Sequence, residues 1–389
     1  MKSIRKKIIQ GKIKINFIKL HKSDGQLLIE LIKKLSKLNS IINKRYKIFS
    51  EDNFLFFPLT DNKKNFIQLK KSIGNKFPFE FVSREGILNP KFKYRSLTEA
   101  LLGKIPEEYF QFIPKSYDII GSIAIIDFLN SSPTNDTEFE IYKKAIANAI
   151  INVNKNVNSV FEKKSGIEGT YRLRNLVLLE GDDKPITTYK ESNCIFKLDV
   201  KKTYFSPRLG YERSRISSYK MDEGDLIVDM FAGIGPFSIQ IAKQHNVKIY
   251  AFDVNPQAYY FLKENIELNK LKGDIFPFKI NVKELLNPIN PTGSLLHNKI
   301  DRIIMNLPGR AINYLDVVCF LMKKSGGILH FYGFSKKPDP IEKIVNFLRK
   351  RLGALDWTAD RILKSKIVKS YSPQADLVVI DANIKHLNP

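Results

Sequence analysis

Two short segments in the C-terminal half of the chain combine turn-forming glycines with carboxylates. Asp229-Met-Phe-Ala-Gly-Ile-Gly235 follows an apolar stretch, and Asp253 ends the next apolar stretch. The glycines allow a sharp turn from strand to helix and a close approach of a ligand to the backbone. A dinucleotide site would place a third glycine here, but Pro236 and Phe237 follow instead. The pattern favours a nucleoside ligand without phosphates, whose ribose hydroxyls donate to Asp253; the alternative is a purely structural turn.

Two further segments end the following predicted strands. Asn281 and Val282 lie after the third predicted strand, where the protein would contact the adenine of such a nucleoside. The alternative is that Asn281 is an ordinary loop asparagine. Asn306-Leu-Pro-Gly309 follows the next strand, which places it beside the cofactor in an open parallel sheet. An asparagine amide both donates to and accepts from the edge of a base. A plain turn would use the same residue types.

A carboxylate and several arginines precede this series, within Ser206-Pro-Arg-Leu-Gly-Tyr-Glu-Arg213 and near residue 173. Methylation of a ring N–H requires removal of its proton, and Glu212 is a candidate base for that step. Negative charge then develops on the neighbouring carbonyl oxygen, which a cation should face. The candidates for this cation are Arg172, Arg174, Arg208 and Arg213. The alternative is a surface Glu-Arg pair at the start of a helix.

The charge of the chain indicates a polyanionic partner. Its 389 residues include 64 Lys and Arg against 40 Asp and Glu, a net charge of +24. The first 50 residues alone carry 14 basic and two acidic residues. Contacts with phosphates would release counterions and supply affinity independent of sequence. Solvated lysines from a biased composition are the alternative. Together with the motifs, the charge favours transfer of a carbon group from S-adenosyl-L-methionine to a base of RNA.

Several classes of protein are disfavoured by the composition. The two cysteines, Cys194 and Cys319, lack partners at metal-ligand spacing, so we expect no zinc site or disulfide framework. We expect no membrane span, because no apolar run reaches about 18 residues. The basic N-terminus lacks the apolar stretch of a signal peptide. We therefore expect a cytoplasmic monomer without a metal.

The order of predicted elements indicates three domains, at residues 1–85, 92–197 and 198–389. The first two mix helices (24–38 and 139–151) with strands, including strands at 12–20, 54–58 and around 170–179. In the third, predicted strands at 226–230, 248–252, 275–280, 301–305, 327–332 and 376–381 alternate with helices. Such alternation predicts an α/β fold with a mostly parallel, doubly wound sheet. Together with the motifs, this order predicts a Rossmann-like (class I) methyltransferase domain with two N-terminal α+β domains.

The chain resembles the archaeal and eukaryotic tRNA (guanine37-N1)-methyltransferases nearly from end to end. The most specific matches are Tyr204-Phe-Ser-Pro-Arg-Leu-Gly-Tyr-Glu-Arg213 and Asp229-Met-Phe-Ala-Gly-Ile-Gly235. Gly169-Thr-Tyr-Arg-Leu-Arg174, Met305-Asn-Leu-Pro308 and Ile367-Val-Lys-Ser-Tyr371 also match. The resemblance implies that the first domain recognises the outer corner of tRNA and the other two the anticodon arm.

The same resemblance implies roles for individual residues. Glu212 would be the general base at guanine N1, Arg172 would stabilise charge on O6, and Asn306 would position the base. Substrate contacts would come from Arg172, Arg174, Tyr204, Arg208 and Pro308. Contacts with S-adenosyl-L-methionine would come from Tyr204, Arg213, Asp229, Phe231, Gly233, Gly235, Asp253, Val254, Asn281, Val282 and Asn306. Asn281 departs from the family pattern, which has an acid near the adenine.

Three alternatives stay open on the sequence. One is a sibling enzyme of the wyosine pathway that transfers the aminocarboxypropyl group, although the Glu212 and Asn306-Leu-Pro308 blocks favour methyl transfer. Another is a dual enzyme that also methylates a wyosine precursor. The last is a non-catalytic RNA-binding protein with a degenerate Rossmann domain.

Overall fold

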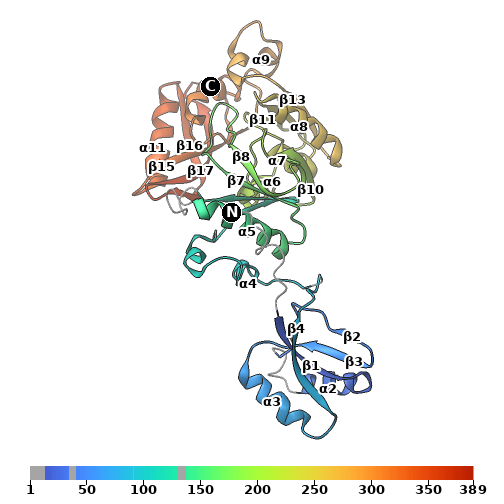
Figure 1. Ribbon diagram of the computed structural model, residues 1–389. Helices are drawn as coiled ribbons and strands as arrows, with labels where there is room; N and C mark the ends of the chain where they lie inside the picture. The colour runs from blue at the N-terminus through green and yellow to red at the C-terminus, as the bar shows by residue number, and fades with distance from the viewer. Residues whose placement is uncertain (1–13, 35–40, 91, 129–136, 389) are drawn as a thin grey trace. The chain divides into compact units, whose positions relative to one another are not determined.

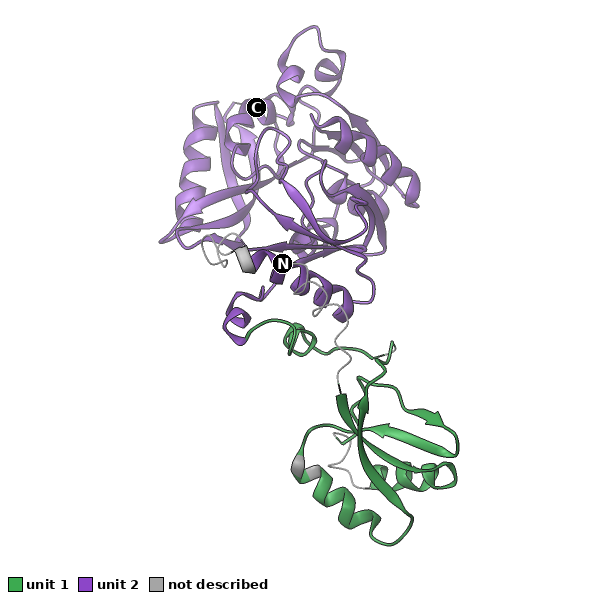
Figure 2. Ribbon diagram, viewed as in Figure 1, with its two compact units in different colours: residues 1–106 green, residues 107–389 purple. Residues whose placement is uncertain are grey.

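The computed structural model describes residues 14–34, 41–90, 92–128 and 137–388. Its contacts divide the chain into two compact units, Met1–Pro106 and Glu107–Pro389 (Figure 2). The basic residues 1–13 and the end of the predicted helix 24–38 lie outside the described residues. The predicted division of the second unit near residue 198 stays a prediction.

The first unit is built on a four-stranded antiparallel sheet in the order β2-β3-β1-β4. Leu28, Leu69 and other apolar residues of its helices pack with strand residues such as Ile18 and Phe57 in one core. The strands are β1 Lys14–His21, β2 Phe49–Glu51, β3 Phe54–Pro58 and β4 Phe79–Glu85. The helices are η1 Lys22–Asp24, α2 Gly25–Lys34, α3 Lys63–Ile73 and α4 Leu97–Leu101.

The second unit begins with two small sheets. One has the order β5-β6-β7-β8, and the other pairs β9 with β10. Their strands are β5 Asp118–Ile120, β6 Ile123–Asp127, β7 Ser159–Lys163, β8 Leu176–Gly181, β9 Ile186–Glu191 and β10 Cys194–Asp199. The helices are η3 Glu107–Phe112 and α5 Thr137–Val153. Residues of both sheets pack with Ile234, Ile239 and Phe261 of the following segment in one core.

The large sheet of this unit has seven strands in the order β13-β12-β11-β14-β15-β17-β16. Its first five strands are parallel, and β17 is antiparallel to both β15 and β16. The strands are β11 Leu226–Asp229, β12 Lys248–Phe252, β13 Asp274–Phe278, β14 Arg302–Met305, β15 Gly327–Lys336, β16 Trp357–Ser372 and β17 Ala375–His386. This arrangement confirms the predicted Rossmann-like α/β fold.

Helices cover both faces of the large sheet because alternate strand residues are apolar on each side (Figure 1). Val228 and Ile303 pack on one face with residues of α10 and α11, whereas Ile227 and Ile304 pack on the other with residues of α6 and α7. The helices are η4 Pro207–Leu209, α6 Gly210–Ser217, α7 Pro236–Gln244, α8 Pro256–Leu268, η5 Val282–Leu286, α9 Pro291–Leu296, η6 Ala311–Tyr314, α10 Leu315–Leu321 and α11 Pro340–Gly353.

One strand was missed, and the start of another was wrong. No strand was predicted over Trp357–Ser372, because register shifts interrupt the alternation of β16 at several points. The strand expected around 170–179 begins only at Leu176. Residues 168–173 instead form a tight hairpin loop, in which Glu168 and Leu173 exchange backbone hydrogen bonds of 2.9 and 3.1 Å.

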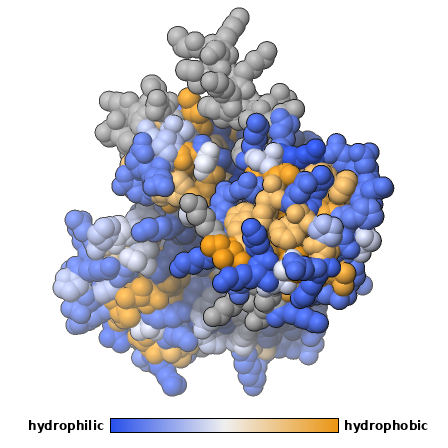
Figure 3. Space-filling view, turned by 60° about the horizontal axis from the view of Figure 1, so that its bottom comes forward, coloured by the Kyte–Doolittle hydropathy of each residue, from blue (hydrophilic) through white to orange (hydrophobic). Residues whose placement is uncertain are grey.

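The surface reflects the high content of charged residues. Hydrophilic residues cover most of the face shown in Figure 3, with smaller hydrophobic areas between them. Among the described residues, no helix combines the length and apolarity that crossing a membrane would require.

Candidate active site

A cavity of about 320 Å³ opens at the carboxyl ends of β11, β12 and β14. In a parallel sheet these ends meet on one side, so loops far apart in the sequence converge there. Ten predicted site residues line the cavity: Arg172, Tyr204, Arg213, Phe231, Gly233, Asp253, Val254, Asn281, Val282 and Asn306. The described lining does not include Arg174, Arg208, Glu212, Asp229, Gly235 or Pro308.

The two glycines after β11 are needed for different structural reasons. Gly233 has φ +58°, and a Cβ there would meet only the Tyr204 carbonyl oxygen, at 3.9 Å. The space over Gly233 therefore belongs to the cavity. Gly235 has φ +87°, and a Cβ there would lie 2.4 Å from Leu262 Cδ1 of α8. Gly235 thus allows close packing of helices, while Gly233 leaves room for a ligand.

Asp253 closes the cavity floor at the end of β12. Its Oδ2 accepts from the Gly233 amide at 2.8 Å, and its Oδ1 accepts from the Asn255 amide at 2.8 Å. Burial raises the pKa of Asp253, and these amides oppose that rise. Each carboxylate oxygen has a second lone pair, so the group can still accept two ribose hydroxyls. Together with the open space over Gly233, this chemistry fits a nucleoside.

Asp229 lies behind this loop. Its side chain is buried, and its Oδ2 accepts from the Ser238 hydroxyl at 2.8 Å. Burial raises the pKa of Asp229 to about 7, although the hydrogen bond from Ser238 opposes the rise. The carboxyl group ties β11 to α7 and so fixes the shape of the glycine loop.

Asn281 has a local structural role that accompanies its place in the cavity wall. Its side chain accepts from the Lys283 amide at 3.1 Å and caps η5, while Glu284 accepts from the Asn281 amide. A capping asparagine satisfies amides at a helix start that would otherwise lack partners. The departure from an acid at this position therefore preserves the turn.

The loop after β14 brings Asn306 to the cavity wall. Its Pro308 carbonyl accepts from the Phe334 amide at 3.3 Å, which anchors the loop to β15. Sequence reasoning missed two lining residues from the same segment, Arg310 and Tyr314. The Tyr314 ring lies 5.1 Å from that of Phe231 in an edge-to-face contact. Their nearness to Asn306-Leu-Pro-Gly309 in the sequence was the only available signal.

The hairpin loop 168–173 supplies a cation on the other side of the cavity. Arg172 has φ +58°, a left-handed conformation that is uncommon outside glycine. Its guanidinium lies 4.9 Å from the centre of the Tyr204 ring, and that of Arg174 lies 6.0 Å from the same ring. A planar cation thus faces an aromatic ring at the cavity, an arrangement suited to a flat base.

Glu212 is buried beneath the cavity and has its own set of partners. Its Oε2 accepts from Arg215 Nε at 3.0 Å and Nη2 at 2.9 Å, and from the Tyr332 hydroxyl at 3.3 Å. Its Oε1 forms an ion pair with Lys366. The Tyr332 ring in turn lies 5.9 Å from that of Phe237, which lines the cavity. Two rings, those of Tyr332 and Phe237, therefore connect the carboxylate with the cavity wall.

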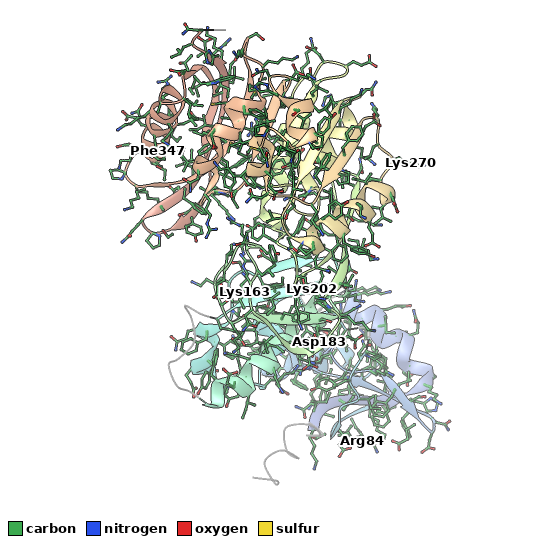
Figure 4. The ribbon with its side chains drawn as sticks, turned by 90° about the horizontal axis from the view of Figure 1, so that it is seen from above. Arg84, Lys163, Asp183, Lys202, Lys270 and Phe347 are labelled. Carbon is green, nitrogen blue, oxygen red and sulfur yellow. The ribbon has the colours of Figure 1, made fainter. Side chains whose placement is uncertain are left out.

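Arg213 and Arg208 have carboxylate partners of their own. Arg213 is buried and donates to both oxygens of Glu191, at 2.7 and 2.6 Å, which ties α6 to β9. Arg208 donates to Asp118 at 2.6 Å and lines a second cavity of about 660 Å³ with Lys163 (labelled in Figure 4). Burial and the nearby Arg174 lower the pKa of Lys163. Lys163 also lies 3.8 Å from Asp118, so the two cations of this cavity share one carboxylate.

Comparisons with known proteins show the family of the chain. The tRNA (guanine(37)-N(1))-methyltransferase Trm5b of Pyrococcus abyssi is 36% identical over 355 residues, covering 90% of this chain and 94% of that protein. The chain belongs to the family of tRNA (guanine37-N1)-methyltransferases. Residues 187–355 match the TRM5/TYW2 methyltransferase domain, 97–184 the TYW2 N-terminal domain, and 18–67 the tRNA methyltransferase 5 N-terminal domain.

Solved structures of this methyltransferase family share the fold. A complex of aTrm5 with tRNALeu superposes with a TM-score of 0.66 at 32% identity, covering 94% of this chain and 99% of that one. Methanocaldococcus jannaschii Trm5 in complex with adenosine gives a TM-score of 0.58 at 32% identity, with coverages of 96% and 99%. The chain is an S-adenosyl-L-methionine-dependent tRNA methyltransferase.

Proposed function

We propose that this enzyme methylates N1 of guanosine 37, 3′ of the anticodon, with Glu212 as the general base. The convergence of Asp253, Asn306 and the Arg172–Tyr204 pair on one cavity carries the proposal. It combines a carboxylate for ribose, an amide for a base edge, and a cation beside an aromatic ring. S-adenosyl-L-methionine supplies the electrophilic methyl group when bound.

The binding of the cofactor is assigned to the cavity floor. Asp253 would accept the ribose hydroxyls, and Gly233 would leave room for the ligand over the glycine loop. Phe231, Val254 and Val282 would supply apolar contact for the adenine and methionine parts. Asp229 would act from behind by fixing the loop, because its carboxyl group binds Ser238.

The base would enter between the hairpin loop 168–173 and Asn306. Guanine exposes N1–H and O6 on one edge, so a proton acceptor and a cation are needed side by side. Asn306 would hold that edge, while Arg172 would face O6 and stabilise the charge that develops there. Tyr204 and Pro308 would shape the pocket. Leaving the anticodon stack costs a few kcal/mol, and contact with Tyr204 would offset part of this cost.

Proton removal is the step assigned to Glu212. As the N1–methyl bond forms and the sulfonium–methyl bond breaks, the N1–H bonding electrons remain on the ring and the proton passes to Glu212. The carboxylate would need to come within about 3 Å of N1. Because Glu212 is buried against Tyr332 and does not line the cavity, its side chain would have to rotate toward the cavity as RNA binds. Catalytic hydrogen bonds commonly tighten only in the substrate complex.

Recognition of the rest of the tRNA is assigned to basic surfaces outside the cavity. Arg208 and Lys163 of the second cavity, together with Arg174, would contact phosphates of the anticodon arm. The first unit would contact the outer corner. Contacts of this kind supply affinity that falls with salt and carries little sequence information.

Product analysis tests the proposal. The enzyme is incubated with cofactor labelled on its methyl group, and with tRNA transcripts carrying G or A at position 37. We expect label in 1-methylguanosine from the G37 transcript and none from the A37 transcript. A second cofactor sample, labelled in the amino acid chain, reports aminocarboxypropyl transfer. Incorporation of that label, or equal methylation of both transcripts, would contradict the proposal.

A further inference from the structure

The two oxygens of Glu212 face different surroundings. Oε2 contacts Arg215 of α6 and Tyr332 of β15, and the side chain of Arg215 is 8% exposed while that of Tyr332 is fully buried. Oε1 faces Lys366 of β16, whose side chain is 27% exposed. Among the described residues, this ion pair is the only polar contact of Oε1. One oxygen is therefore held by interior groups and the other by a side chain at the surface.

The interior partners are fixed by a second carboxylate. Asp381 of β17 is fully buried and binds both terminal nitrogens of Arg215. It also accepts from the Tyr219 hydroxyl at 2.8 Å and faces His330 Nδ1 at 2.7 Å. Burial lowers the pKa of His330, and Arg302 donates to its Nε2, so the neutral ring donates its Nδ1–H to Asp381. Arg215 therefore cannot follow Glu212 if that carboxylate moves.

Lys366, unlike Arg215, is not held by a second carboxylate in the described part of the chain. It lies on β16, an edge strand, between register shifts at Ile362/Lys364 and Ile367/Lys369. Bulges of this kind re-aim a side chain locally. Its ammonium lies 4.3 Å from the centre of the exposed Tyr211 ring, beside Glu212 on the same helix. A lysine on a flexible four-carbon stem can stay with a carboxylate through a change of rotamer.

We propose that Lys366 is a positioning residue for the catalytic base: it stays paired with Oε1 of Glu212 and accompanies that oxygen toward guanine N1. Oε1 has two lone pairs, one for the lysine and one for the N1 proton. Arg215 is held in place by Asp381, so Lys366 is the cation that can remain beside the Glu212 carboxylate after its side chain rotates. This inference rests on the proposed role of Glu212 as the base.

The pH dependence of methyl transfer tests the inference. Lys366→Met keeps the apolar stem over Tyr211 and removes the charge. Single-turnover rates are measured from pH 5 to pH 9 at saturating tRNA and cofactor. A nearby cation favours the ionised form of a carboxylate. Removal of the Lys366 charge should therefore raise, by about one pH unit, the pH below which the rate declines (the acid limb of the profile). At pH values below this limb the variant should be about tenfold slower than wild type, while the two rates at high pH should be nearly equal.

Three controls complete the experiment. Lys364→Met removes the same charge from the same strand and should leave the profile unchanged, whereas Lys366→Arg should restore the wild-type limb. In a Glu212→Gln background, Lys366→Met should have no further effect on the profile. If Glu212→Gln is slow but the Lys366→Met and Lys364→Met profiles coincide, the inference about Lys366 is wrong. If Glu212→Gln keeps the wild-type rate, the proposed base itself is wrong.

Discussion

The cavity floor and the charge cluster around Glu212 lie on neighbouring parts of one sheet but are organised in opposite ways. At the floor, Asp253 binds backbone amides and keeps free acceptor capacity toward open space over Gly233. In the cluster, Glu212 is surrounded by the side chains of Arg215, Tyr332 and Lys366. Asp253 at the floor can therefore bind a ligand without rearrangement, whereas Glu212 in the cluster must first leave some of its partners.

This difference shows how the same residue type serves two purposes. Backbone amides fix the position of a carboxylate without adding a mobile charge, which suits a group that only binds. Buried cationic side chains hold a charge that must later act, but they make folding depend on complete pairing. Substitutions in the cluster should therefore affect stability most, and those at the floor should affect ligand binding more.

The largest effect on stability should come from Asp381→Ala. It removes the fully buried partner of Arg215, His330 and Tyr219, and breaking a buried ion pair costs about 3–5 kcal/mol. The measurement is the free energy of unfolding in urea. The control is Asp360→Ala, which breaks an exposed pair with Lys385 in the same hairpin and should cost less than about 1 kcal/mol. Equal losses of unfolding free energy in the two variants would contradict the idea that the buried cluster matters more for stability than a surface ion pair.

Gly233 and Gly235 of the glycine loop should respond differently to substitution by alanine. Gly235→Ala places a methyl group 2.4 Å from Leu262 Cδ1 at φ +87° and should destabilise the fold by about 1–3 kcal/mol. Gly233→Ala meets open space at φ +58° and should cost only about 1 kcal/mol. Calorimetry should then show the larger loss of cofactor affinity in the folded Gly233→Ala protein. The reverse pattern would mean that the space over Gly233 is not the ligand site.

Asp229 should affect stability as a dependence on pH. Burial raises its pKa to about 7 in the fold, from 3.8. The folded state therefore binds this proton more tightly, so the stability that it contributes is complete below about pH 4 and is lost as pH rises through about 7. Relative to Asp229→Asn, the wild-type protein should lose about 2–3 kcal/mol between pH 5 and pH 8. A difference that stays constant with pH would contradict this.

The sequence predicted the floor far better than the cluster. Asp253 and Asn306 end apolar strands, so their place at one edge of a parallel sheet follows from local pattern and the rules of that fold. Apart from Arg215 on the same helix, the partners of Glu212 come from β15 and β16, and no local pattern links those strands to α6. Lys366 lies one residue before a matched motif and was still missed, because register shifts disguise its strand.

The methylation rate of the Glu212→Gln variant is the decisive test of Glu212 as the general base. This substitution keeps the size of the side chain and removes its ability to accept the N1 proton. Single-turnover methylation of G37 tRNA is measured beside the dissociation constant for the same tRNA. We predict a rate lower by about 10²–10⁴ with the dissociation constant within about threefold of wild type. A wild-type rate, or an equal loss of rate and affinity, would contradict the assignment of Glu212 as the base.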